Sequence, residues 1–484
     1  MKRYYLLFTC LFIQILAKAQ TYPSNIEQKI HTIENSMVKR VADDGKPSLT
    51  LKQLMAKYKV KGISIAVIHN YKLEWAKGYG WADEKRHIPV TAQTLFEAGS
   101  ISKSLNAVGV LKLAQTKKLN LFADINQYLT SWKFPYSAVA KGRHITMANL
   151  LSHTAGLTVH GFPGYETGKP LPGIVQILDG KKPANSPAVR SEFEPGLKFQ
   201  YSGGGITIAQ LMVMDITHQP YAQYMFDNVL KPLGMLNSTY AQPPVNIKPE
   251  LLAAGYDETG KAIASKYHVY PEQAAAGLWT NPTDLSKFII EVQQAYAGRS
   301  AKVLNHQTTQ LMLAPYLNQS AAMGVFIDDY NGVKYFEHSG VDEGFISHYY
   351  GSFNNGDGVV VMINTNNMDI ISQVINTIAG VYHFNGLYRA PKKQVKLSAD
   401  AMKGFAGKYV IANPAMTLNI IVKKDHLLIT PTGDDAFTVY PEGQNKFFAK
   451  DFNVDIEFVR SANRQVNGIT LTQDGAKMAG KKAQ

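Results

Sequence analysis

The sequence predicts an α+β fold followed by a smaller all-β region, and three patterns support this prediction. Two strand-like runs near the N-terminal end precede a long, mostly helical stretch, after which strand-like runs and a closing helix return. This order indicates one sheet that is assembled from both ends of a segment and flanked by helices. Beyond about residue 395 the hydrophobic period changes to two, which is typical of an antiparallel sandwich or a small barrel.

The elements of the first region follow from the spacing of apolar residues. Helical spacing predicts helices over 26–41, 51–58, 102–117 and 370–381. Strands are predicted at Gly62–His69, Leu73–Gly80, Gly332–Glu337, Gly344–Ser352 and Gly358–Ile363. The first two of these strands are joined by a turn around Asn70 and predict a hairpin.

The second region begins after a short linker predicted at Ala390–Lys393. Its short strands alternate in hydrophobicity and are separated by turn residues. They are predicted at Gly407–Ile411, Met416–Val422, Leu427–Pro431, Phe437–Tyr440, Lys446–Ala449, Val454–Val459 and Gly468–Thr472.

The composition sets the broad class of the protein. Of its 484 residues 45% are hydrophobic, which excludes disordered and fibrous classes, and this length favours two domains. The formal net charge of +13 permits binding to nucleic acid or to an anionic surface without indicating either. A single cysteine excludes an intramolecular disulfide and a Cys-rich zinc site.

The N-terminus has the pattern of a secretory signal peptide. Lys2 and Arg3 precede the mostly apolar run Tyr4–Leu16, and small residues frame a cleavage site after Ala19. The run is too short for a membrane anchor, which needs about 20 apolar residues. A lipoprotein cysteine at Cys10 is the other alternative, but apolar residues continue after it.

Cleavage there has two consequences. It removes three basic residues, which lowers the formal charge from +13 to +10, and it removes the only cysteine, which suits an oxidising compartment. We therefore expect a periplasmic or secreted protein without a nucleic-acid partner, whose basic surface is free to associate with the cell envelope.

The first candidate for chemistry is the Ser100-Ile101-Ser102-Lys103 run. On a helix, residues three apart share a face, so Lys103 would lie beside the Ser100 hydroxyl and could act as the base that a serine nucleophile needs. The alternative is a helix N-cap with a solvated lysine. Ser36 and Lys39 match the same pattern, but Ser36 falls inside a predicted surface helix, whereas Ser100 follows Gly99 at a strand-to-helix transition.

The second candidate is Tyr201, which precedes Ser202 and three glycines at 203–205. The glycines predict a tight turn before a helix that begins at Ile206. No Gly-Lys-Ser/Thr follows, so a phosphate loop is not indicated. Tyr201 is either a packing aromatic residue or a proton-transfer group.

The third candidate is His338-Ser339-Gly340, where the glycine would allow a substrate to approach the strand closely. His338 would orient a carboxylate, move a proton or be purely structural. The Ser339 hydroxyl and the backbone N–H of Val341 would face the same cleft.

The order of these three motifs resembles that of the serine β-lactamase and penicillin-binding protein superfamily, especially the class C β-lactamase-related esterases and D-aminopeptidases. The run Leu150–Leu157 (LLSHTAGL), Pro232–Met235 and Ala276–Trp279 fit the same family, and the resemblance covers roughly residues 45–385. Residues from about 395 resemble a lipocalin-like β-barrel. This division implies a signal peptide at 1–19, a hydrolase domain at 20–390 and a small antiparallel barrel at 391–484.

The resemblance implies a role for each matching residue. Ser100 would be the acylated nucleophile, Lys103 its proton acceptor and Tyr201 a second acid/base group. His338 would take the place of the lysine in the family's Lys-Thr-Gly triplet.

The same resemblance implies how the substrate would be held. The backbone N–H groups of Ser100 and Val341 would form the oxyanion hole. Ser339 and Gly340 would contact the substrate beside them.

One position departs from the family pattern. Many members have Tyr-x-Asn where this chain has Tyr201-Ser202-Gly203, and the missing amide would contact the lysine and the acyl side of the substrate. Its loss, together with His338 in place of a lysine, argues against efficient β-lactam hydrolysis.

The sequence therefore predicts an exported serine hydrolase that cleaves an ester or a peptide-like amide of a small molecule or a peptide, such as a D-amino-acid or cell-wall compound. The alternatives are a β-lactamase and a catalytically weak penicillin-binding or sensor protein. The 13 histidines form no metal-ligand motif such as His-Glu-x-x-His. No motif for a redox cofactor is present either, so no cofactor is expected. The sequence does not define an oligomeric state.

Overall fold

The computed structural model describes residues 21–42, 47–330, 332–412, 415–433, 435–450, 454–473 and 476–483. The predicted signal peptide, with Cys10, lies outside them. No helix in these ranges has the length and apolarity that a membrane crossing requires.

A seven-stranded antiparallel sheet forms the centre of the first region, with the order β4-β3-β2-β12-β11-β10-β9. Its strands are β2 (Gly62–His69), β3 (Lys72–Asp83), β4 (Ile88–Pro89), β9 (Phe326–Tyr330), β10 (Val333–Asp342), β11 (Phe345–Ser352) and β12 (Gly358–Ile363). β2 pairs with β12, with Val67 opposite Val359, so the two ends of the segment meet in mid-sheet. The α+β class and the sheet assembled from both ends are confirmed.

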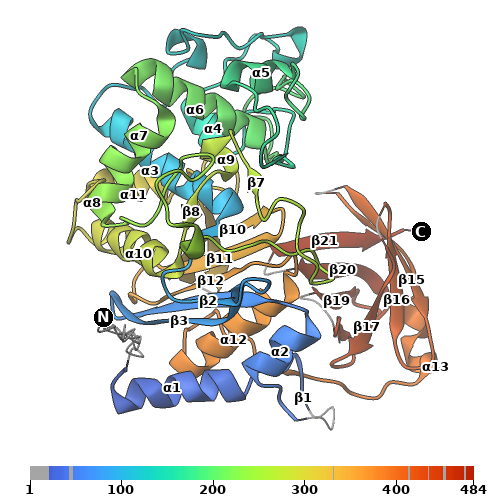
Figure 1. Ribbon diagram of the computed structural model, residues 1–484. Helices are drawn as coiled ribbons and strands as arrows, with labels where there is room; N and C mark the ends of the chain where they lie inside the picture. The colour runs from blue at the N-terminus through green and yellow to red at the C-terminus, as the bar shows by residue number, and fades with distance from the viewer. Residues whose placement is uncertain are drawn as a thin grey trace, which may run out of the picture.

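Both faces of the sheet are covered, because β2 and β12 are apolar on both sides. Ile63, Ile65 and Val67 pack against one layer, whereas Ala66 and Ile68 pack against the other. The first layer holds α1 (Ser24–Asn35), α2 (Leu51–Lys57) and α12 (Asp369–Tyr382), which lie below the sheet in Figure 1. The second layer is the helical insertion above it.

The insertion connects β3 and β4 to β9 and supplies most of the larger hydrophobic core. Its longer helices are α3 (Ser102–Gln115), α6 (Gly203–Thr217) and α10 (Pro282–Tyr296). The shorter helices are α4 (Met147–Leu151), α5 (Ile174–Asp179), α7 (Tyr221–Met225), α8 (Lys231–Leu233), α9 (Gln273–Ala276) and α11 (His306–Met312). A small two-stranded sheet pairs β5 (Phe96–Glu97) with β8 (Trp279–Thr280).

Two local predictions were wrong. The first helix ends at Asn35 instead of 41, because the Met37 N–H bonds the Leu49 carbonyl and turns the chain away; Ser36 is an exposed C-cap. The three glycines are not a turn but the first turn of α6, where the Ser202 hydroxyl accepts a hydrogen bond from the Gly205 N–H.

The C-terminal region is a closed eight-stranded antiparallel barrel, as expected for a lipocalin-like fold. It lies to one side of the sheet in Figure 1. The strands are β14 (Gly407–Ile411), β15 (Met416–Val422), β16 (Leu427–Pro431), β17 (Phe437–Pro441), β18 (Lys446–Phe448), β19 (Val454–Arg460), β20 (Val466–Gln473) and β21 (Ala476–Lys482), preceded by α13 (Ala399–Met402).

Buried aromatic side chains of the barrel and of the turn before β14 pack against one another. The rings of Phe405, Phe447 and Phe458 lie 4.3–5.4 Å apart, centroid to centroid, and Tyr409 packs against Phe458. All four rings are buried.

The barrel is tied to the first region near its own start. β13 (Lys392–Lys393), within the predicted linker, pairs in parallel with β1 (Val41–Ala42). The Arg40 guanidinium donates to the Ala449 carbonyl at 2.6 Å, which fixes one side of the barrel against the N-terminal segment.

Candidate active site

Ser100 lies in a single 3₁₀ turn, Gly99–Ile101, that leads into α3. The Lys103 Nζ donates to Ser100 Oγ at 2.8 Å and to the Ala275 carbonyl of α9 at 2.7 Å. Lys103 is only 2% exposed. The alternative of a helix cap with a solvated lysine is therefore wrong: the N-cap of α3 is Ile101, and the lysine is buried against the serine.

Tyr201 lies on the other side of Lys103, just before the N-terminus of α6. The Lys103 Nζ is 5.1 Å from the centroid of the Tyr201 ring. The His160 Nδ1–H donates to the Tyr201 carbonyl at 2.6 Å, and Phe326 of β9 stacks on the Tyr201 ring at 6.5 Å. Lys103 is thus enclosed between the serine and the tyrosine.

His338 is a buried, neutral imidazole on β10. Its Nδ1–H donates to the Ser339 carbonyl at 2.5 Å, which leaves Nε2 as the acceptor, without a partner in the described residues. Burial, helped by the Lys103 charge and opposed by that of Glu337, lowers the pKa of His338 to about 4. At neutral pH His338 can accept a proton or a hydrogen bond, but it carries no charge with which to hold a carboxylate.

The strand β10 contacts the serine turn so closely that glycine is required on both sides. A β-carbon on Gly340 would lie 1.9 Å from the Ala98 carbonyl oxygen, and one on Gly99, which has φ +52°, would lie 2.5 Å from the Val341 nitrogen. This contact brings the Val341 backbone beside the residue that precedes Ser100. The role of Val341 as the second oxyanion donor stays a prediction.

The edge of β10 is open at this point. β9 pairs with β10 only as far as Glu337, so Ser339, Gly340 and Val341 have no strand partner on that side among the described residues. Ser339 is half-buried, and Val341 is 53% exposed. An extended substrate could therefore lie along this edge.

His153, in the LLSHTAGL run, is a site residue to which the sequence assigned no role. It is buried with φ +57°, and its ring lies 4.3 Å from that of Tyr201. Burial holds its pKa well below the usual range, with the Lys103 charge adding to the effect, and its Nδ1 accepts from the Ser202 N–H at 3.2 Å. His153 therefore positions Tyr201. The LLSHTAGL run, which contains His153, is the sequence feature that could have identified it as a site residue.

The space beside Gly203 is also occupied. A β-carbon on Gly203 would lie 3.0 Å from Phe162 Cε2, which is tighter than an ordinary carbon contact. Phe162 is half-buried and comes from the loop before β6 (Tyr165–Glu166). A side chain on residue 203 would therefore press against this ring.

Three buried carboxyl groups, which the sequence did not single out, surround this site. Glu97 of β5, Glu272 before α9 and Asp342 at the end of β10 are each at most 4% exposed. Burial raises the pKa of Glu272 to about 8; burial and the Asp342 charge raise the pKa of Glu97. Burial also raises the pKa of Asp342, against the opposing charge of Lys103. The site thus combines three buried carboxyl groups with one buried lysine, Lys103.

Comparison with known proteins shows the family to which the chain belongs. The Beta-lactamase family model matches residues 49–374, most of the first region. The chain belongs to the beta-lactamase family. Proteins with this fold are serine hydrolases, and the predicted membership of the β-lactamase and penicillin-binding protein superfamily is confirmed.

Curated proteins with similar sequences include two that represent different parts of the family. Protein flp of Staphylococcus aureus strain MW2 is 27% identical over 319 residues, covering 63% of this chain and 60% of that protein. A Beta-lactamase of Pseudomonas fluorescens is 31% identical over 245 residues, covering 50% and 62%. The chain therefore spans about three fifths of the length of these relatives.

Solved structures share the fold. The octameric penicillin-binding protein homologue from Pyrococcus abyssi has a TM-score of 0.59 at 20% identity, covering 89% of this chain and 98% of that one. The D-amino acid amidase from Ochrobactrum anthropi SV3 has a TM-score of 0.56 at 19% identity, covering 75% and 99%. At these identities the likeness extends to the fold alone.

Proposed function

We propose that the protein is an exported serine hydrolase that forms an acyl-enzyme on Ser100 and cleaves an ester or a peptide-like amide. The observation that carries the proposal is the 2.8 Å contact between the buried Lys103 amine and the Ser100 hydroxyl. A serine hydroxyl becomes an effective nucleophile only when a neighbouring group takes its proton.

The proposed reaction has two balanced steps. In the first, Ser100 Oγ bonds to the substrate carbonyl carbon while the Lys103 amine takes the hydroxyl proton. The bond to the leaving alcohol or amine then breaks, and the proton passes to it. In the second, water attacks the acyl carbon, its proton passes through Tyr201 to Ser100 Oγ, and the bond from Oγ to the acyl carbon breaks to release the acid. The N–H groups of Ser100 and Val341 would hold the negative oxygen in both steps.

Two features favour esters and simple amides over β-lactams. His338 is neutral and buried, so it offers no cation to a substrate carboxylate, and residue 203 has no amide, with the Phe162 ring 3.0 Å from where its β-carbon would lie. A β-lactamase and a weak penicillin-binding or sensor protein therefore remain the alternatives that experiment must separate.

Labelling with active-site probes tests the proposal. The mature protein is incubated with a fluorophosphonate probe, a fluorescent penicillin and a chromogenic short-chain ester, alongside Ser100→Ala and Ser36→Ala. We expect fluorophosphonate labelling and ester turnover that vanish only in Ser100→Ala. Absence of labelling and turnover in the wild type would leave the binding protein as the better interpretation, and rapid penicillin turnover would favour the β-lactamase.

Export is tested separately. We expect protein recovered from the periplasm or the medium to begin at Gln20, as N-terminal sequencing would reveal. An intact N-terminus in a cytoplasmic fraction would contradict the proposal.

A further inference from the structure

A cavity of about 320 Å³ adjoins the open edge of β10, and Val341 forms part of its wall. Phe162, which covers Gly203, forms another part, so the cavity lies between the Tyr201 loop and the end of β10. Its ionisable carboxyl groups are Glu258, Asp342 and Glu343. A group bound there would lie next to the backbone N–H that we assign to the oxyanion hole.

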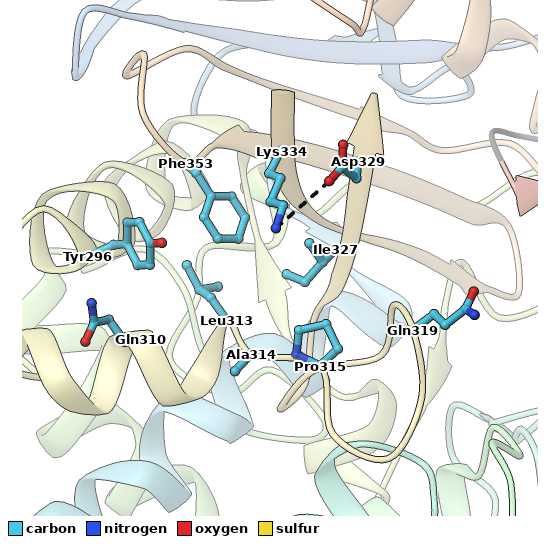
Figure 2. Close-up of a pocket in the computed structure, with 10 residues that line it drawn as sticks. All are labelled: Tyr296, Gln310, Leu313, Ala314, Pro315, Gln319, Ile327, Asp329, Lys334 and Phe353. Carbon is cyan, nitrogen blue, oxygen red and sulfur yellow. Dashed lines mark ion pairs between the residues drawn. The ribbon is translucent and has the colours of Figure 1, made fainter. Parts of the chain in front are cut away.

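The lining of this cavity is acidic, and the opposing charge that acts on Asp342, that of Lys103, lies outside the lining. Its lining contains no Lys, Arg or His, and none of its three carboxyl groups forms an ion pair within the described ranges. A second cavity, of about 330 Å³ and shown in Figure 2, provides a contrast. There the single carboxylate, Asp329, is paired with Lys334 at 3.9 Å, as the dashed line marks.

Asp342 is the strongest indication of a ligand. It is 4% exposed, lines the cavity, and its Oδ2 has no hydrogen-bond partner in the described part of the chain. A buried carboxyl oxygen without a partner is costly, and its cost falls when a donor of positive charge binds.

The wall around Asp342 is rigid. The Asn366 Nδ2 donates to the Asp342 carbonyl at 3.0 Å, and the Asn366 Oδ1 accepts from the Gly344 N–H at 2.7 Å. The Tyr270 hydroxyl accepts from the Glu343 N–H at 3.0 Å. The turn between β10 and β11 is therefore held before any ligand arrives, which reduces the ordering cost of binding.

We propose that this cavity binds an ammonium group of the substrate, so that the preferred substrates are cationic esters or amides. This proposal rests on the proposed hydrolase function of Ser100. No group of three or more His, Cys, Asp or Glu side chains in the described residues is placed to hold a metal ion, so we assign the cavity to an organic cation. Glu258 and Glu343 form its exposed rim, and Asp342 forms its floor.

Two pairs of esters matched in shape test the charge preference. D-alanine methyl ester and methyl (R)-lactate differ in charge on the acyl side, and butyrylcholine and 3,3-dimethylbutyl butyrate differ on the alcohol side. Hydrolysis is followed by acid release, at a pH well below the α-amino pKa of about 8. In at least one pair we expect kcat/KM to favour the cation by about tenfold or more, and the preference to shrink at high salt.

Variants locate the preference. The double variant Glu258→Gln/Glu343→Gln removes the two exposed carboxylates at the rim, which lie outside the catalytic groups. Asp342→Asn removes the buried carboxyl group at the base of the cavity. Asp329→Asn, in the cavity of Figure 2, is the matched control. We expect the preference to fall in the rim variant and to persist in the control. Equal rates within both pairs, or a preference unchanged in the rim variant, would overturn the proposal.

Binding measurements separate failure of this proposal from failure of the hydrolase function. The same four esters are titrated into Ser100→Ala by calorimetry. Wild-type turnover without any charge preference contradicts the ammonium site alone. Absence of wild-type turnover, with cation binding that depends on the rim carboxylates, contradicts the hydrolase function alone.

Discussion

The ring of Phe162 lies where a side chain on residue 203 would begin: a β-carbon on Gly203 would be 3.0 Å from Phe162 Cε2. Gly203 follows Ser202, the N-cap of α6, so its backbone is fixed by the helix. The asparagine of the Tyr-x-Asn pattern could enter only if Phe162 moved. The size of the side chain that residue 203 can carry therefore depends on the side chain at residue 162.

Restoring the asparagine alone should therefore fail to restore reaction with penicillin. We expect Gly203→Asn to leave acylation by a fluorescent penicillin unchanged or slower, whereas Phe162→Ala/Gly203→Asn raises it about tenfold, the value of one hydrogen bond to the substrate. Stopped-flow fluorescence measures both, with Phe162→Ala as the control. A single Gly203→Asn as fast as the double variant would mean that Phe162 is no obstacle.

Removing the lysine amine should abolish most of the ester activity. In Lys103→Met we expect kcat/KM for a chromogenic ester to fall by about 10²–10⁴, the usual contribution of a positioned acid/base group, with an unchanged circular dichroism spectrum. Lys112→Met is the matched control, because Lys112 also lies on α3 and donates to a backbone carbonyl, that of Val303, at 3.0 Å. Equal losses in both variants would indicate a structural effect of the helix.

His338 should make the native state sensitive to acid. Its pKa of about 4 in the folded protein lies below its ordinary value of 6.5, so the unfolded chain binds the proton more tightly. Stability is therefore lost as the pH falls from about 6.5 to 4, by roughly 3 kcal/mol from this group.

Chemical denaturation at several pH values checks this expectation. In His338→Gln the free energy of unfolding should fall less steeply over this range than in the wild type. His31→Gln, on the exposed side of α1, should behave like the wild type. Identical slopes in all three proteins would contradict the buried, neutral state of His338.

The contact between β10 and the serine turn should tolerate no side chain at residue 340. Because a β-carbon on Gly340 would lie 1.9 Å from the Ala98 oxygen, we expect Gly340→Ala to lower the free energy of unfolding by about 3 kcal/mol and to remove activity. Gly161→Ala, where a β-carbon meets no atom within 4 Å, is the control. Thermal unfolding and ester turnover would reveal a difference, and a stable, active Gly340→Ala would refute the contact.

The parts of the site that the sequence predicts are those set by local geometry. Ser100 and Lys103 are three residues apart on a helix, so their contact requires only that the helix forms. The sheet was predictable because β2 and β12 are apolar on both faces and short enough to exclude buried helices.

The parts that were missed depend on contacts between distant segments. Phe162 meets Gly203 only because the loop before β6 folds over the start of α6. Glu97, Glu272 and Asp342 come from three separate elements, and nothing in their local sequence indicates that they are buried. Their environment, and with it the acidic character of the site, follows from tertiary packing alone.

The aromatic filling of the C-terminal barrel limits what that region can do. Because the buried rings of Phe405, Phe447 and Phe458 pack against one another, an apolar cargo such as a fatty acid could take their place only by disrupting this cluster. A contribution of the barrel to recognition would therefore come from its outer wall and its connecting loops.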